Sequence, residues 1–134
     1  MNKKNTLKLF KEFPNLFPNR DNLQKSLMAF GFMCGDAWFD LVHKLCQDIQ
    51  LELDKDPSLK EDVYVEEVKE KFGGLRFYIT CGNRAIFDLI EKAEKESYKI
   101  CEICGAPGEI SVANHWYQTL CEKHRKIKRA ELAK

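Results

Sequence analysis

Two pairs of metal-binding side chains near the C-terminus constrain this chain more than any other feature. Cys101 and Cys104 are separated by two residues. After sixteen further residues, Cys121 and His124 are again separated by two. This spacing is typical of a structural zinc site, because a Cys-x-x-Cys turn directs two sulfurs at one point and Gly105 lets the backbone fold beneath the metal. The sequence therefore predicts one Zn²⁺ bound by three thiolates and one imidazole.

A site with four protein ligands leaves no coordination position for water or substrate, so we expect the metal to be structural and not catalytic. His115 is an alternative fourth ligand. His124 is the better placed of the two, because only two residues separate it from Cys121.

The size of the chain, 134 residues and 15.7 kDa, predicts one compact unit. We expect a body of residues 1–98 with a zinc-binding module of residues 99–134 packed against it. No run reaches the roughly 18 apolar residues of a membrane span. Charged residues interrupt the N-terminal apolar segment, which argues against a secretory signal. These features predict a cytoplasmic protein that does not bind membranes.

Disulfides are rare in the cytoplasm, so the cysteines of the predicted site are expected to bind metal and not to form bridges. Cys34, Cys46 and Cys81 lie outside that site. We expect them to be small buried core residues, because free cysteine is among the most buried residue types.

Hydrophobic periodicity predicts an α+β fold in which helices pack on a small antiparallel hairpin or sheet. Asp21, Asp36 and Asn83 are the expected helix N-caps. The predicted elements are helices over 6–13, 21–30, 36–53 and 83–98, a polar loop over 54–62, a β-hairpin within 63–81, extended pieces near 110–112 and 116–119, and a helix from Cys121.

The helix over 36–53 has the clearest pattern, with apolar residues at steps of three and four, as on a helix with one face in the core. That stripe comprises Trp38, Leu41, Val42, Leu45, Cys46, Ile49 and Leu53.

The hairpin pattern alternates from Val63 and Val65 and resumes at Val68 after a slip. Gly73 and Gly74 are expected at its turn, because paired glycines accept the positive φ of tight turns. The side chains expected inside are Phe72, Leu75, Phe77 and Ile79.

The C-terminal third is predicted to contain a knuckle, which is the metal-binding turn from Cys101 to Gly105, then a short hairpin and a helix whose first turn supplies the last two ligands. This order resembles a treble-clef zinc finger over residues 99–131, with histidine in place of the more usual fourth cysteine. Treble clefs serve nuclease, RNA-binding, ubiquitin-linked and purely structural roles, so the resemblance does not select a function.

Three longer motifs resemble a largely uncharacterised family of small proteins from bacteria and their phages. They are residues 35–41 (GDAWFDL), 68–78 (VKEKFGGLRFY) and 101–108 (CEICGAPG), with a closing Thr119-Leu120-Cys121. The resemblance implies a zinc site and an accessory protein of phage or prophage origin. It also implies a partner in the host, whose defence or regulatory complex the chain would inhibit.

The net charge of +1 conceals a segregation along the chain. Residues 1–26 and 121–134 each carry six basic and two acidic residues, whereas residues 44–70 carry four basic and nine acidic ones. Basic ends suit an acidic protein or nucleic acid, but also a solvated surface. The candidate contact residues are Lys69, Lys71, Arg76 and Tyr78 in the hairpin and Lys123, Arg125, Lys126, Lys128 and Arg129 in the last helix.

Two histidines suggest a third class of function, a small nuclease or hydrolase. Asp40 and His43 share the polar face of the long helix, where they could act together as a general base or share a metal. Asn114-His115 resembles the catalytic segment of His-Asn-His nucleases, but those enzymes catalyse at the treble-clef metal, which cysteines saturate here. The sequence thus favours a non-enzymatic protein that binds a host or phage protein, with nucleic-acid binding as the alternative.

Overall fold

Over residues 1–133, which are those the structure describes, the computed structural model has five α-helices, a three-stranded sheet and a two-stranded sheet. The predicted α+β class is confirmed. No helix in this range is both long and apolar enough to cross a bilayer. The elements are α1 (Lys3–Glu12), β1 (Phe32–Met33), α2 (Phe39–Lys55), α3 (Pro57–Lys60), β2 (Val65–Lys71), β3 (Gly74–Ile79), α4 (Arg84–Ser97), β4 (Glu109–Ala113), β5 (Trp116–Leu120) and α5 (Glu122–Leu132).

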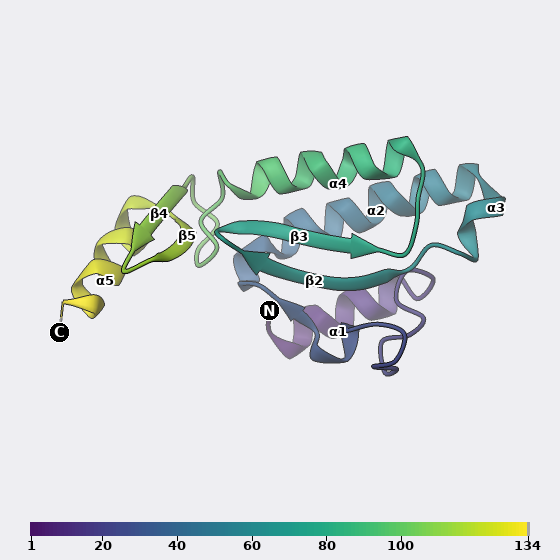
Figure 1. Cartoon of the computed structure of the whole chain (residues 1–134), viewed down its shortest axis with the longest axis horizontal. Helices are drawn as coiled ribbons and strands as arrows, with labels where there is room; N and C mark the ends of the chain where they lie inside the picture. Colours follow the sequence, from purple (N-terminus) through teal and green to yellow (C-terminus); the bar gives the residue numbers. More distant parts are fainter. Residues whose placement is uncertain (134) are drawn as a thin grey trace.

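The three-stranded sheet is mixed, whereas the pattern predicted only antiparallel pairing. β1 pairs with β2 in parallel and β2 pairs with β3 antiparallel, so the strand order is β1-β2-β3. In Figure 1, α2 lies behind this sheet, α4 runs along β3 above it, and α1 lies below it. The β4–β5 hairpin and α5 extend from one end of the molecule. The division of the chain after residue 98 stays a prediction.

The long helix buries its predicted stripe, except that Leu41 is only half-buried. Its start differs from the prediction, because residues 36–38 form a 3₁₀ turn and α2 begins at Phe39. Asp36 is not its N-cap. The Asp36 carboxylate instead accepts a hydrogen bond from the N–H of Asn2 at 2.5 Å and so connects the start of α1 to the start of α2.

The predicted helix over residues 21–30 is wrong. Turns occupy this segment up to a 3₁₀ turn at Met28–Phe30, and β1 follows. The N–H of Leu27 donates to the carbonyl of Glu66 in β2 at 2.7 Å, so the segment is bound to the sheet. The expected loop over 54–62 contains a single helical turn, α3, whose N-cap Asp56 accepts from the N–H of Ser58.

The predicted hairpin is present, and its register shifts just after Val65, where the pattern slips. Its turn is different, because Phe72 and Gly73 have the positive φ angles, 53° and 87°. Phe72 is therefore 60% exposed and not inside as expected. Gly74 belongs to β3, where a Cβ atom would lie 2.3 Å from the Tyr98 ring. Gly73 thus serves the turn, and Gly74 serves close packing.

Cys34 and Cys46 are buried as expected, but Cys81 is exposed, and the prediction is wrong there. Cys81 follows β3 in the connection to α4, outside the apolar alternation that the core imposes on the strand. None of the six cysteines, all of which lie in the described residues, forms a disulfide.

Candidate metal centre

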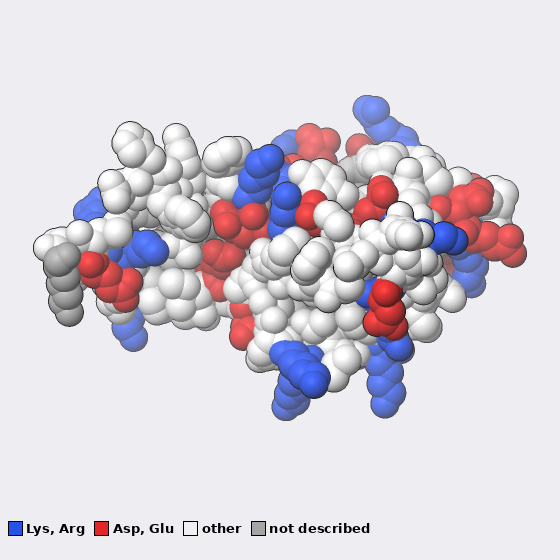
Figure 2. Space-filling view, turned by 60° about the horizontal axis from the view of Figure 1, so that its bottom comes forward, with Lys and Arg blue, Asp and Glu red and all other residues white. Residues whose placement is uncertain are grey.

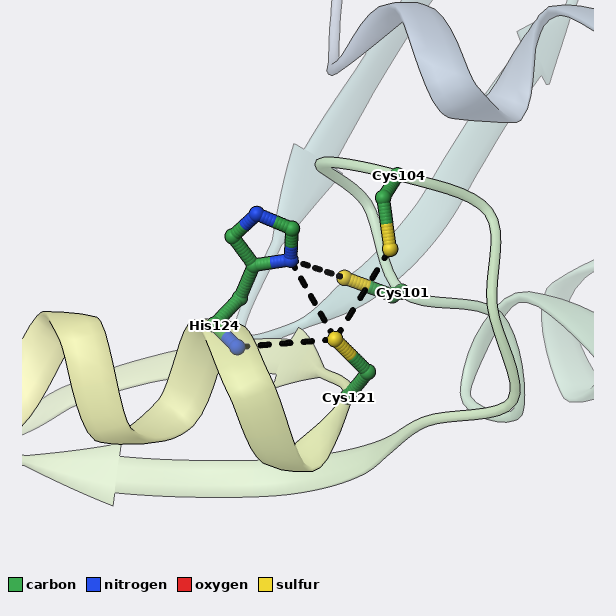
Figure 3. Close-up of side chains that lie close together, drawn as sticks. All are labelled: Cys101, Cys104, Cys121 and His124. Atoms are coloured by element: carbon green, nitrogen blue, oxygen red, sulfur yellow. Dashed lines mark hydrogen bonds between the residues drawn. The ribbon is translucent and has the colours of Figure 1, made fainter.

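Three cysteines and one histidine converge between the loop after α4 and the first turn of α5 (Figure 3). Their ligand atoms all lie within 4.8 Å of one another. The group consists of Cys101, Cys104, Cys121 and His124, the four residues that the spacing predicted.

Of three distances between these atoms, two match those of a tetrahedral zinc site, and the third is shorter. Zn–S bonds of about 2.3 Å and Zn–N bonds of about 2.0 Å place tetrahedral ligand atoms roughly 3.5–3.8 Å apart. The Sγ atoms of Cys104 and Cys121 are 3.7 Å apart. The Nδ1 atom of His124 is 3.2 Å from the Cys121 Sγ and 3.7 Å from the Cys101 Sγ. The group can therefore hold a metal ion with protein atoms alone.

The loop between Cys101 and Ala106 forms the first half of the site. Gly105 has a φ angle of 83°, and its N–H donates to the carbonyl of Cys101 at 2.9 Å. The N–H of Cys101 in turn donates to the carbonyl of Ala106 at 2.8 Å. These two hydrogen bonds close the turn that brings the first two sulfurs together.

The second half of the site is the start of α5. Cys121 is the N-cap of this helix, and its Sγ accepts from the N–H of His124 at 3.5 Å. A thiolate at this position also interacts favourably with the positive end of the helix dipole.

Backbone hydrogen bonds prepare one thiol for the metal. Burial raises the pKa of Cys101, but N–H groups in the adjacent backbone, including those of Cys121 and Cys104, outweigh burial and lower the pKa to about 6. Metal binding requires the thiolate. The backbone around Cys101 therefore favours the thiolate form that a metal requires.

Glu102, between two ligands, connects the metal centre to the body. Its carboxylate accepts from the N–H of Gly35 at 3.0 Å, and the residue is only 8% exposed. Burial raises the pKa of Glu102, whereas the hydrogen bonds from Gly35 and Gln118 oppose the increase. Sequence reasoning missed this contact, because a single buried carboxylate leaves no periodic signal.

The three longer sequence motifs meet at this junction. A Cβ atom on Gly35 would lie 2.2 Å from the carbonyl oxygen of Glu102. The indole Nε1 of fully buried Trp38 donates to the carbonyl of Ile100 at 3.0 Å. The hydroxyl of Thr119 donates to the carbonyl of Gly73 at 2.6 Å. Packing between body and metal centre thus accounts for residues in each motif.

Replacing Thr119 with valine is expected to lower the free energy of unfolding by about 1–3 kcal/mol. Valine preserves the shape of this fully buried side chain but leaves the Gly73 carbonyl without its donor. Chemical denaturation of the metal-loaded protein measures the loss. The control is Thr6→Val, at a half-buried position in α1, where the change should stay within about 0.5 kcal/mol. Equal effects of the two substitutions would contradict the role of the Thr119 hydroxyl.

The other histidines lie outside the metal group. His115 is exposed in the turn between β4 and β5, with a φ angle of 65°. The imidazole Nε2 of His43 lies 2.5 Å from a carboxylate oxygen of Glu12 in α1, so Glu12 is its hydrogen-bond partner. Phe13 adds an edge-to-face contact with His43 at 5.5 Å. This cluster joins α1 to α2.

Two candidate contact residues of the hairpin already bind other side chains of this protein. Arg76 donates to Glu94 at 2.6 Å and to the hydroxyl of Tyr98 at 3.2 Å, and Lys69 pairs with Glu67 at 3.4 Å. Figure 2 shows Lys and Arg side chains together with acidic ones at the end that carries α5, and further Asp and Glu side chains where this end meets the rest of the molecule. The charges along this face are therefore mixed.

Known proteins give no guide to the function of this chain, so its function is argued from its own residues. No protein-family model, curated protein or solved structure matches this chain.

Proposed function

We propose that this chain is a non-enzymatic, protein-binding protein whose binding surface is held in place by one structural zinc ion. The observation that carries the proposal is the closed donor set, in which four side chains supply every position of a tetrahedral site. Three thiolates and an imidazole match the softness that Zn²⁺ prefers, and zinc at such a site supplies folding energy.

The C-terminal segment needs this metal because its own apolar core is small. The buried apolar residues form a large cluster in the body and a small one in this segment. The small cluster consists of Cys101, Leu120 and Cys121, with Ala106 packed against it. No residue of α5 within the described range is buried. Coordination therefore does for this segment what a hydrophobic core does for the body.

We further propose that the partner is a host protein. The resemblance of residues 35–41, 68–78 and 101–108 to proteins of bacteria and their phages supports an accessory protein that inhibits a defence or regulatory complex. A treble-clef zinc finger, in which the knuckle, hairpin and helix assemble around the metal, suits such a rigid scaffold.

Nucleic-acid binding is the alternative, and one contact favours it. Trp116 is 60% exposed, and the ammonium of Lys128 lies 6.0 Å from its ring centroid. Exposed aromatic rings beside cations suit stacking on bases. Acidic side chains partly neutralise the basic residues nearby. Lys126 pairs with Glu122 at 3.1 Å, and Arg125 pairs with Glu109 at 3.8 Å.

Affinity capture from a bacterial lysate, with and without nuclease, tests the proposal. The metal-loaded chain should retain a stoichiometric protein partner that survives nuclease treatment, identified by mass spectrometry. Retention that nuclease abolishes and that weakens steeply with salt would support the alternative instead. Capture of neither a protein nor a nucleic acid would contradict both.

A further inference from the structure

A long groove lies between α2 and α4 and ends at the metal centre. Its volume is about 710 Å³, and Cys104 and Gly105 of the metal-binding loop are among its lining residues. Both the helical body and the metal-bound loop are therefore needed to shape it.

The floor of this groove is apolar and incompletely covered. Leu41 and Leu45 contribute from α2, and Leu89 and Ala93 contribute from α4, in each case four residues apart. Leu41, Leu89 and Ile100 all pack against the core but are only partly buried. Packing between α2 and α4 thus leaves part of the apolar face of each helix uncovered.

The rim of the groove is predominantly acidic. Asp36, Asp40, Asp48 and Glu96 face two lysines, Lys44 and Lys92. The ammonium of Lys44 lies 3.4 Å from the Asp48 carboxylate, so these two charges offset each other, and the acidic excess comes from Asp36, Asp40 and Glu96 against Lys92. When zinc is bound, three thiolates leave the centre at the end of the groove with one net negative charge. The charges therefore complement a cationic partner.

The walls of the groove determine the shape of that partner. Side chains spaced by four residues on two neighbouring helices form ridges, and a third helix packs between such ridges. An extended peptide is disfavoured, because it gains affinity from main-chain hydrogen bonds with a free strand edge. Helical walls already use their backbone groups internally.

We propose that this groove binds a basic amphipathic helix of the partner protein, with its apolar face on the leucine floor and its Lys and Arg side chains on the acidic rim. This inference rests on the proposed function, and it assigns the docking site of that partner. It also assigns a purpose to the metal, because the zinc-bound knuckle forms part of the groove lining.

The test uses two synthetic, fluorescently labelled helices of about 18 residues with the same leucine face. One carries Lys and Arg on its flanks and the other carries Glu. Fluorescence anisotropy with the zinc-loaded full chain should show the cationic helix binding at least about tenfold more tightly than the anionic one.

Charge reversal locates the site. Asp40→Lys/Glu96→Lys should weaken binding of the cationic helix at least about tenfold. The matched control is Asp88→Lys/Glu91→Lys, which makes the same change in net charge at exposed positions of α4 outside the groove and should weaken binding less than about threefold. Amide exchange protection on helix binding should appear in α2 and α4.

Several results would overturn the inference. They are absence of binding by the cationic helix, equal binding of the two helices, or equal effects of the two charge reversals. Self-association of the chain that Asp40→Lys/Glu96→Lys disrupts would show that the occupant is a second copy. If a partner captured from lysate binds this variant normally, the groove assignment fails while the proposed function stands.

Discussion

Substituting Cys104 with serine is expected to remove the metal and to unfold the C-terminal segment. The remaining three ligands bind zinc far more weakly, and structural zinc contributes roughly 10–16 kcal/mol to the folding of small zinc fingers. Metal analysis should give one zinc per chain for the wild type and much less than one for Cys104→Ser. Amide exchange should lose protection from residue 100 to the end of α5, because this segment buries few side chains of its own.

Cys81→Ser is the matched control. Cys81 is also an exposed cysteine, but it lies outside the metal group. Its replacement should leave the zinc content at one and amide exchange unchanged. A wild-type protein that is folded without metal, or a Cys104→Ser protein that retains zinc and protection, would refute the structural role of the centre.

Gly35→Ala is expected to have the second largest effect, a loss of about 3 kcal/mol in the free energy of unfolding. Gly35 has an ordinary φ angle of −70°, so the effect is steric and not conformational. The added methyl group would meet the backbone oxygen of Glu102 at 2.2 Å, and backbone cannot move aside as a side chain can. Denaturation of the zinc-loaded protein measures the loss, and faster amide exchange at residues 100–108 should accompany it.

Gly82→Ala separates this clash from a general effect of adding a methyl group. At position 82 the nearest atom is the flexible side-chain tip of Ile79 at 3.1 Å. We expect a change below about 1 kcal/mol there. Equal stability of Gly35→Ala and the wild type would show that the knuckle does not rest on the body as described.

The metal group was predictable because its signal is local. Two residues between ligands within each pair bring both members to one point, whatever the rest of the chain does. The strongly periodic elements were predictable for a similar reason. α2 has its buried stripe, α4 starts after the N-cap Asn83, and β4, β5 and α5 lie where the extended pieces and the final helix were expected.

The errors arose where a distant contact decides the local conformation. Residues 21–30 are not helical, because Leu27 is bound to β2. Asp36 resembles an N-cap in sequence, but the N–H of Asn2 takes its carboxylate. Gly74 resembles half of a turn, but it makes room for Tyr98. In each case the partner is more than twenty residues away, beyond the reach of periodicity.

The sequence by itself determined the α+β class, the main helices and the four side chains that could hold a metal ion, because periodicity and ligand spacing are properties of neighbouring residues. Only the tertiary structure decided what surrounds the ligands. It placed Glu102 against Gly35, Thr119 against Gly73, and the knuckle at the end of the groove between α2 and α4. The two hydrogen bonds join segments more than forty residues apart, and their geometry depends on how the body packs as a whole.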